Sequence, residues 1–166
     1  MSESHIPAKP VSSAFRYTPL TNPLTEIRLA ILEPALSDDD EIRCQLHTVD
    51  IAEAKYESLS YAWGDESVKV PIIFCGQPFL VTANLAHALR NLRFESSDPK
   101  KKRALWIDAL CIDQLNHTER SEQVQRMGSI YKSADNVLVV RINGSLSPFF
   151  AAHCISSIAI YSRFNI

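Results

Sequence analysis

Two apolar strands joined by a helix constrain this chain more than any other feature. Residues 105–108 (LWID) and 136–140 (NVLVV) are almost continuously apolar, which is typical of strands that are covered on both faces of a parallel sheet. Between them, Asn116 can cap a helix that has Glu119 at its third position. The expected apolar stripe of this helix is Val124, Met127 and Tyr131. The sequence therefore predicts a βαβ unit, in which the helix crosses over and the two strands run parallel.

Further strands are expected upstream of this unit. Residues 26–34 and 41–49 alternate apolar and polar positions around an acidic turn, which indicates an antiparallel pair. Residues 56–65 (YESLSYAWGD) read as a strand that ends in a turn, and residues 68–82 read as a hairpin turning at 76–78. Asn84 is the expected cap of a following helix. The buried stripe of that helix is expected to be Leu85, Ala88, Leu89 and Leu92.

Three segments follow from these patterns. Residues 1–25 are rich in Pro, Ser and Thr without a periodic apolar pattern, so a flexible leader is expected there. Residues 26–140 form one domain. Residues 141–166 contain no Asp or Glu and form a divergent tail, in which residues 151–161 fit either a helix or a strand.

The composition argues against several kinds of partner. With a formal net charge of -2, the chain has no overall field that would attract a nucleic acid or an anionic membrane. The basic run at 100–103 follows a polar break and is expected to be a solvated loop. No stretch reaches the roughly 18 apolar residues of a membrane span, so an intracellular, cytoplasmic protein is expected. The four cysteines lie too far apart for a metal knuckle, and no metal site is predicted.

Asp108 and Asp113 lie within an otherwise apolar stretch, 105–114 (LWIDALCIDQ). We expect residues 105–108 to be strand and residues 109–114 to be a loop over the carboxyl edge of the sheet, where open α/β sheets bind ligands. The alternative is structural: Asp108 accepts backbone N–H groups of the loop, and Asp113 helps to cap the next helix. A buried, structural Cys111 is favoured over a nucleophile, since no partner histidine is identifiable.

The turn after residues 56–61 is the second part of this candidate site. Trp63, Gly64 and Asp65 follow a strand end, and Gly64 permits a tight turn that admits a ligand closely. The Trp63 indole can either stack on a base or cover the end of the sheet. The candidate ligand-facing residues are therefore Trp63, Gly64, Asp65, Asp108 and Asp113. With four glycines in the chain there is no glycine-rich phosphate loop.

Residues 56–65, 105–120 and 123–140 resemble, in order, the three signature blocks of the fungal heterokaryon incompatibility (HET) domain. The family is implicated in self/non-self recognition between fusing fungal cells and in the cell death that follows incompatibility. It has been likened to the TIR domain, a flavodoxin-like fold. The resemblance implies an α/β fold with a mostly parallel TIR-like sheet, flanking helices and an added N-terminal antiparallel strand pair. It also implies an interaction module whose partners are homotypic or other incompatibility proteins.

Some TIR domains hydrolyse NAD, so the resemblance also implies an alternative function as a hydrolase with NAD as ligand. The catalytic glutamate of those TIR domains follows the third strand, whereas this chain has no acidic residue after Asp135. We therefore expect no intrinsic hydrolysis, and the catalytic residues stay unassigned. The third block also lacks the family's Trp-Leu-Gly ending after Val139, which raises the further alternative of a truncated, non-functional product.

Overall fold

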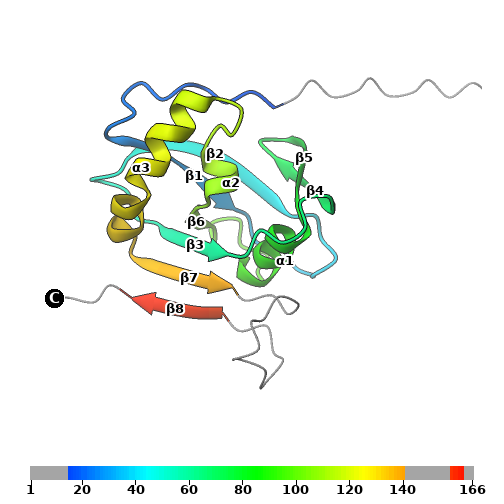
Figure 1. Ribbon diagram of the computed structural model, residues 1–166. Helices are drawn as coiled ribbons and strands as arrows, with labels where there is room; N and C mark the ends of the chain where they lie inside the picture. Colours follow the sequence, from blue (N-terminus) through cyan, green and yellow to red (C-terminus); the bar gives the residue numbers. More distant parts are fainter. Residues whose placement is uncertain (1–14, 141–157, 163–166) are drawn as a thin grey trace, which may run out of the picture.

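The computed structural model describes residues 15–140 and 158–162, which build one mixed sheet with three helices. The strand order is β5-β4-β2-β1-β6-β3-β7-β8. Figure 1 shows α3 beside the strands and β8 outermost, next to β7. The elements are β1 (Glu26–Leu32), β2 (Arg43–Asp50), β3 (Glu57–Tyr61), β4 (Lys69–Phe74), β5 (Gln77–Thr82), α1 (Ala83–Leu92), β6 (Arg103–Trp106), α2 (Asp108–Cys111), α3 (His117–Ser133), β7 (Asn136–Val140) and β8 (Ile158–Ser162).

The N-terminal antiparallel strand pair is confirmed. β1 and β2 pair along their whole length, from Glu26 opposite Asp50 to Leu32 opposite Cys44. The β4–β5 hairpin is confirmed as well, with its turn at Cys75 and Gly76. Both turn residues have positive φ, 50° and 79°, which matches the twist of tight hairpin turns.

The βαβ unit is confirmed with one addition. β6 and β7 both run parallel to β3, which lies between them, and α3 makes the crossover. Ser58 of β3 is the register partner of Trp106 on one side and of Val137 on the other. Since β3 is the central strand of this unit, the three segments that resemble the HET blocks form neighbouring parts of the sheet.

The expectation of a mostly parallel sheet is wrong. Of the seven strand pairings within residues 15–140 and 158–162, four are antiparallel and three are parallel. β1 joins the parallel unit through an antiparallel pairing with β6, where the fully buried Ala30 and Leu105 are register partners. An antiparallel neighbour needs no crossover helix, so β1 and β6 can pair without one. Because the sheet combines parallel and antiparallel pairings, the architecture is mixed α/β.

Two helix details differ from the expectations. The cap of α1 is Thr82, whose side chain accepts from the Leu85 N–H, and not Asn84. The expected stripe of α1 is buried as predicted. In α3, the Asn116 cap is confirmed, but Val124 is 52% exposed, so it is not a core position. The buried residues of α3 are Glu119, Gln123 and Ile130.

The segment before β1 packs onto the domain. Phe15 contacts the rings of Phe74 and Phe79, with centroids 4.8 and 5.9 Å away. The Tyr17 hydroxyl donates to the Leu110 carbonyl. Folded structure thus extends before Glu26, where the sequence placed the start of the domain. Residues 1–14 of the expected leader lie outside the described residues.

Part of the expected tail adds to the sheet. Residues 158–162 form β8, which pairs antiparallel with β7 from Val140 opposite Ile158 to Asn136 opposite Ser162. Of the two alternatives for residues 151–161, strand therefore holds for 158–161, and the rest lies outside the described residues. Among the helices of the described ranges, none is long and apolar enough to cross a membrane.

Candidate functional site

Trp63 and Asp108 meet at the carboxyl ends of two neighbouring strands. Because β3 and β6 are parallel and paired, their carboxyl ends lie at the same edge of the sheet. Each residue follows its strand end by two positions. Trp63 lies close enough to the Asp108 carboxyl to lower its pKa, against the larger effect of burial. The expected juxtaposition of these two segments is therefore present.

The sequence suggested that Asp108 is the last residue of a strand. In the structure it is the first residue of the one-turn helix α2. β6 ends at Trp106, and Ile107 is the extended residue that caps α2. The Asp108 Oδ1 accepts from the Ala109 N–H at 2.8 Å. This bond agrees with the structural reading of Asp108, but it accounts for only one oxygen of the carboxyl group.

The environment of Asp108 disfavours its charge. Burial raises the pKa of Asp108 above its ordinary value, and the hydrogen bond from Ala109 and the closeness of Trp63 offset only part of this effect. A half-buried acid with a raised pKa beside an indole is the kind of group that functional sites contain. It can hold a proton or bind a ligand that carries hydrogen-bond donors.

Gly64 and Asn84 hold the turn that carries Trp63. Gly64 has a φ of +73°, and a Cβ at this position would lie 2.3 Å from the Asn84 Nδ2. That amide donates to the Ala62 carbonyl at 2.9 Å. Asn84 therefore fixes the turn after β3 instead of capping α1, and the Trp63 side chain stays 38% exposed.

The other two predicted acids make local turns. The Asp65 Oδ1 accepts from the Ser67 N–H and hydroxyl at 2.8 and 2.7 Å, and these bonds lower the pKa of Asp65. The Asp113 Oδ1 accepts from the Leu115 N–H at 3.1 Å. Both carboxylates organise the backbone two residues further on, so the geometry gives them structural roles.

Two tyrosines near Asp108 were missed by the sequence reasoning. Tyr61 ends β3, and Tyr131 packs edge-on against Trp106 with ring centroids 5.5 Å apart. Burial, followed by the charge of Asp108, raises the pKa of both phenols, that of Tyr131 to about 12. The Tyr131 hydroxyl donates to the Leu59 carbonyl at 3.0 Å. Strand alternation around Tyr61 was the available signal for an aromatic side chain at this edge.

A buried ion pair was also missed. Arg28 on β1 contacts Glu119 on α3 through two hydrogen bonds of 2.5 and 3.0 Å, and both side chains are at least 91% buried. Burial alone would raise the pKa of Glu119, but the bonds from Arg28 and from the Asp113 N–H outweigh it and lower that pKa. The only feature of the sequence that points to this buried polar contact is the four-residue spacing of Glu119 and Gln123, which places two polar side chains on the same side of the helix.

Cys111 is structural. It is 3% exposed, and burial raises the pKa of its thiol to about 12. The Cys111 Sγ accepts from the Ile107 N–H at 3.3 Å and lies 3.7 Å from the Leu105 carbonyl. A thiol that stays protonated at neutral pH is a poor nucleophile, so the preference for a structural cysteine agrees with its surroundings.

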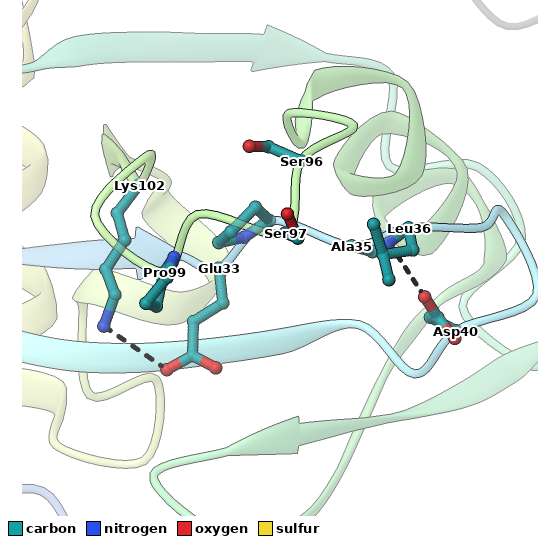
Figure 2. Close-up of a pocket in the computed structure, with 9 residues that line it drawn as sticks. Glu33, Ala35, Leu36, Asp40, Ser96, Ser97, Pro99 and Lys102 are labelled. Carbon is teal, nitrogen blue, oxygen red and sulfur yellow. Dashed lines mark hydrogen bonds and ion pairs between the residues drawn. The ribbon is translucent and has the colours of Figure 1, made fainter.

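A hollow of about 450 Å³ lies at the opposite end of β6. Figure 2 shows Lys102, which precedes β6, directed toward Glu33, with 3.7 Å between their charged atoms. The other lining residues are Pro34, Ala35, Leu36, Asp40, Ser96, Ser97 and Pro99, all but Pro34 labelled in Figure 2. This hollow is open, its lining combines polar and apolar residues, and it does not include Trp63 or Asp108. Within residues 15–140 and 158–162, no group of three or more His, Cys, Asp or Glu is placed to hold a metal ion.

Fold and site together define a mixed α/β domain that presents an aromatic–carboxyl edge at the ends of its parallel strands. Residues 56–157 match the family described as "Heterokaryon incompatibility protein (HET)", and the chain belongs to this family. Over 130 residues the chain is 35% identical to "Heterokaryon incompatibility protein 6, OR allele" of Neurospora crassa. The aligned region covers 72% of this chain and 19% of that protein. The chain thus spans about a fifth of the length of this relative. No solved structure matches it.

Proposed function

We propose that this domain acts as an interaction and signalling module in fungal self/non-self recognition and in incompatibility-triggered cell death. Family membership and the Neurospora crassa relative support the role in incompatibility. The observation that carries the proposal is that Trp63 is exposed where the carboxyl ends of the paired strands β3 and β6 meet. Both strands belong to the segment that matches the family.

Partners are proposed to be a second copy of the domain or other incompatibility proteins, in the cytoplasm. An exposed tryptophan beside a carboxyl group suits a protein interface, because Trp is the side chain that most often dominates binding energy there. The parallel β6-β3-β7 unit supports a TIR-like arrangement around this edge.

The test is inducible expression of the full chain in Neurospora crassa, with growth arrest and dye uptake as readouts of cell death. We expect the unchanged chain to cause cell death and Trp63→Ala to reduce it. Leu80→Ala is the matched control, because Leu80 is 62% exposed on the edge strand β5. Cell death that Trp63→Ala leaves unchanged, or that Leu80→Ala reduces equally, would contradict a role for this edge.

A second candidate function is binding of NAD or a related nucleotide at the same edge. The closeness of Trp63 to the Asp108 carboxyl favours it, since an indole can stack on a planar base while a carboxyl group accepts hydrogen bonds. Incubation of the purified protein with NAD separates binding from turnover. Binding without release of nicotinamide is the expected result if this candidate holds, and release that Asp108→Ala abolishes would establish an enzyme.

A further inference from the structure

The backbone of residues 108–114, which presents Asp108 to the candidate site, is held by side chains from distant parts of the chain. The Leu110 carbonyl accepts from the Tyr17 hydroxyl at 3.1 Å. The Cys111 carbonyl accepts from the Arg28 Nη1, also at 3.1 Å. A one-turn helix has few backbone bonds of its own, so these outside donors define where the segment lies.

The far end of the same segment is held by the partner of Arg28. The Asp113 N–H donates to the Glu119 Oε1 at 2.9 Å, and this oxygen also accepts from Arg28. Arg28 and Glu119 therefore form one buried unit that binds residues 108–114 at two points, 111 and 113.

Arg28 also binds the segment before β1, residues 15–25, which we call the N-terminal strap. The Arg28 Nη2 donates to the Thr18 carbonyl at 2.7 Å. The Arg28 guanidinium carbon lies 5.1 Å from the centre of the Tyr17 ring, within the range of a cation–π contact. The strap thus contacts the 108–114 segment directly through Tyr17 and indirectly through Arg28.

Both ends of the N-terminal strap are attached to other elements. Phe15 packs on Phe74 at the end of β4. Near the other end, the Arg126 side chain of α3 donates to the carbonyl of Pro23. In between, the strap has no helix or strand, and Arg16, Thr18 and Pro19 are exposed. Such a segment opens at lower free energy than the sheet beneath it.

We propose that Tyr17 and Arg28 are positioning residues through which the N-terminal strap sets the conformation of residues 108–114 and of the Asp108 carboxyl. When the strap is seated, the carbonyls of Leu110 and Cys111 are both bound and Asp108 is kept against Trp63. When the strap opens, Leu110 loses its partner and Arg28 loses two of its contacts. The edge of β3 and β6 is thereby coupled to the N-terminal segment. This bears on signalling only if the proposed function of that edge holds.

The test is hydrogen exchange of the full chain, measured residue by residue by NMR. Tyr17→Phe removes the hydroxyl bound to Leu110 and keeps the ring over Arg28. Loss of one net hydrogen bond of about 1 kcal/mol predicts about fivefold faster exchange at residues 109–113, with β1 and β3 unchanged. Tyr131→Phe is the matched control, because its hydroxyl binds Leu59 on β3, and it should leave 109–113 unchanged.

A second readout separates positioning from plain stabilisation. The titration of the Asp108 carboxyl is followed by its carbon chemical shift in the unchanged chain, in Tyr17→Phe and in Tyr17→Ala. Positioning predicts that the pKa of Asp108 falls toward its ordinary value, more in Tyr17→Ala, because a loosened segment admits water. The further fall from Tyr17→Phe to Tyr17→Ala measures the part of the effect that comes from the ring over Arg28, and the fall in Tyr17→Phe measures the part that comes from the hydroxyl.

Two results would overturn the proposal: faster exchange spread evenly over the sheet, or an Asp108 titration that neither variant changes. Both measurements use purified protein. The positioning role can therefore hold when Trp63→Ala fails to affect cell death, and it can fail while the proposed function of the edge survives.

Discussion

Arg28 and Glu119 dominate the electrostatics of the interior because both are charged and almost fully buried. Removing two ions from water costs several kcal/mol per ion, which only close contacts and further hydrogen bonds repay. Here the guanidinium reaches Thr18 and Cys111, and the carboxylate reaches the Asp113 N–H. The sequence places both residues in the right elements, but it contains no signal that pairs β1 with α3 across 91 positions.

We expect Arg28→Met to destabilise the domain by about 3–5 kcal/mol, because the Glu119 carboxylate is left buried without its partner. The double variant Arg28→Met, Glu119→Leu should recover much of this loss, since it removes both charges. Urea denaturation of the purified variants measures these differences. Arg43→Met is the control, because the pair of Arg43 and Glu41 is exposed and should contribute under about 1 kcal/mol. A double variant as unstable as Arg28→Met alone would show that packing, and not charge, sets the cost.

Asp108 has a stability effect of the opposite sign. Its folded-state pKa is raised, so the folded state binds the proton more tightly than the unfolded state does. Its contribution is therefore complete below the unfolded value of about 3.9 and is lost as the pH rises through the folded-state pKa. At neutral pH the charged form is destabilising, and Asp108→Asn should raise the stability.

Urea denaturation of Asp108→Asn at pH 7 and near pH 3.5 measures this effect. The gain should be present at pH 7 and shrink toward zero at the lower pH, where both states of the original residue are protonated. Asp65→Asn is the control, because burial is absent there and the pKa of Asp65 is lowered by Ser67, so a gain at pH 7 is not expected. A loss of stability in Asp108→Asn at pH 7 would favour the structural reading of this carboxyl group.

At the scale of elements, turn and cap chemistry separates what sequence can predict from what it cannot. The Asn116 cap and the antiparallel pairing of β1 with β2 were predicted from local patterns, and both are confirmed, although β1 is buried at nearly every position and does not alternate. The cap of α1 was misplaced because Thr82 and Asn84 are both good capping residues. The contact of Asn84 with Ala62, which depends on the packing of α1 against the end of β3, decided between them.

Gly64→Ala should destabilise the domain by about 2–3 kcal/mol, because the added Cβ meets both a positive φ and the Asn84 amide. Gly76→Ala has the same positive φ but nothing within 4 Å, so about 1 kcal/mol is expected. The double variant Gly64→Ala, Asn84→Ala should lose only the backbone part. Thermal unfolding of the three variants provides the comparison. Equal losses in Gly64→Ala and Gly76→Ala would contradict a steric role for Asn84.

One member of the expected apolar stripe of α3 was mispredicted for a physical reason, whereas Met127 and Tyr131 pack against the core as expected. Helical spacing favoured Val124 as a core residue, yet the helix buries Glu119 and Gln123 and leaves Val124 half exposed. A periodicity argument counts apolar residues, so it fails where a charged partner from another strand, here Arg28, makes a polar face the buried one. The prediction of the candidate site was incomplete for the same reason, because the role of Glu119 in holding residues 108–114 depends on Arg28.

At the scale of the whole molecule, the order of strands in the sheet was the least predictable feature. The βαβ unit follows from local patterns and from the need for a crossover between parallel strands. The insertion of β3 between β6 and β7, and the antiparallel docking of β1 on β6, depend on contacts between segments tens of residues apart. Apolar and polar patterns along the sequence predict where strands lie, but they do not predict which strands pair with each other.

β8 covers the outer edge of β7 with five register pairs, and removing it should change the association state of the molecule. A chain that ends at residue 157 keeps the whole segment that matches the family but leaves the backbone groups of NVLVV unpaired at the edge. Unpaired apolar edge strands template pairing with another chain. We therefore expect the shortened chain to form dimers or larger species at concentrations where the full chain does not, measured by light scattering after gel filtration.

A charge on the exposed edge is the control for this mechanism. Val137 on β7 is half-buried, and Val137→Lys in the shortened chain should restore the association state of the full chain, because lysine on an edge strand opposes pairing with a second strand. The same substitution in the full chain should leave the association state unchanged. If the shortened chain behaves like the full chain, or if Val137→Lys has no effect on its association, then β8 is not what keeps β7 from pairing with another molecule.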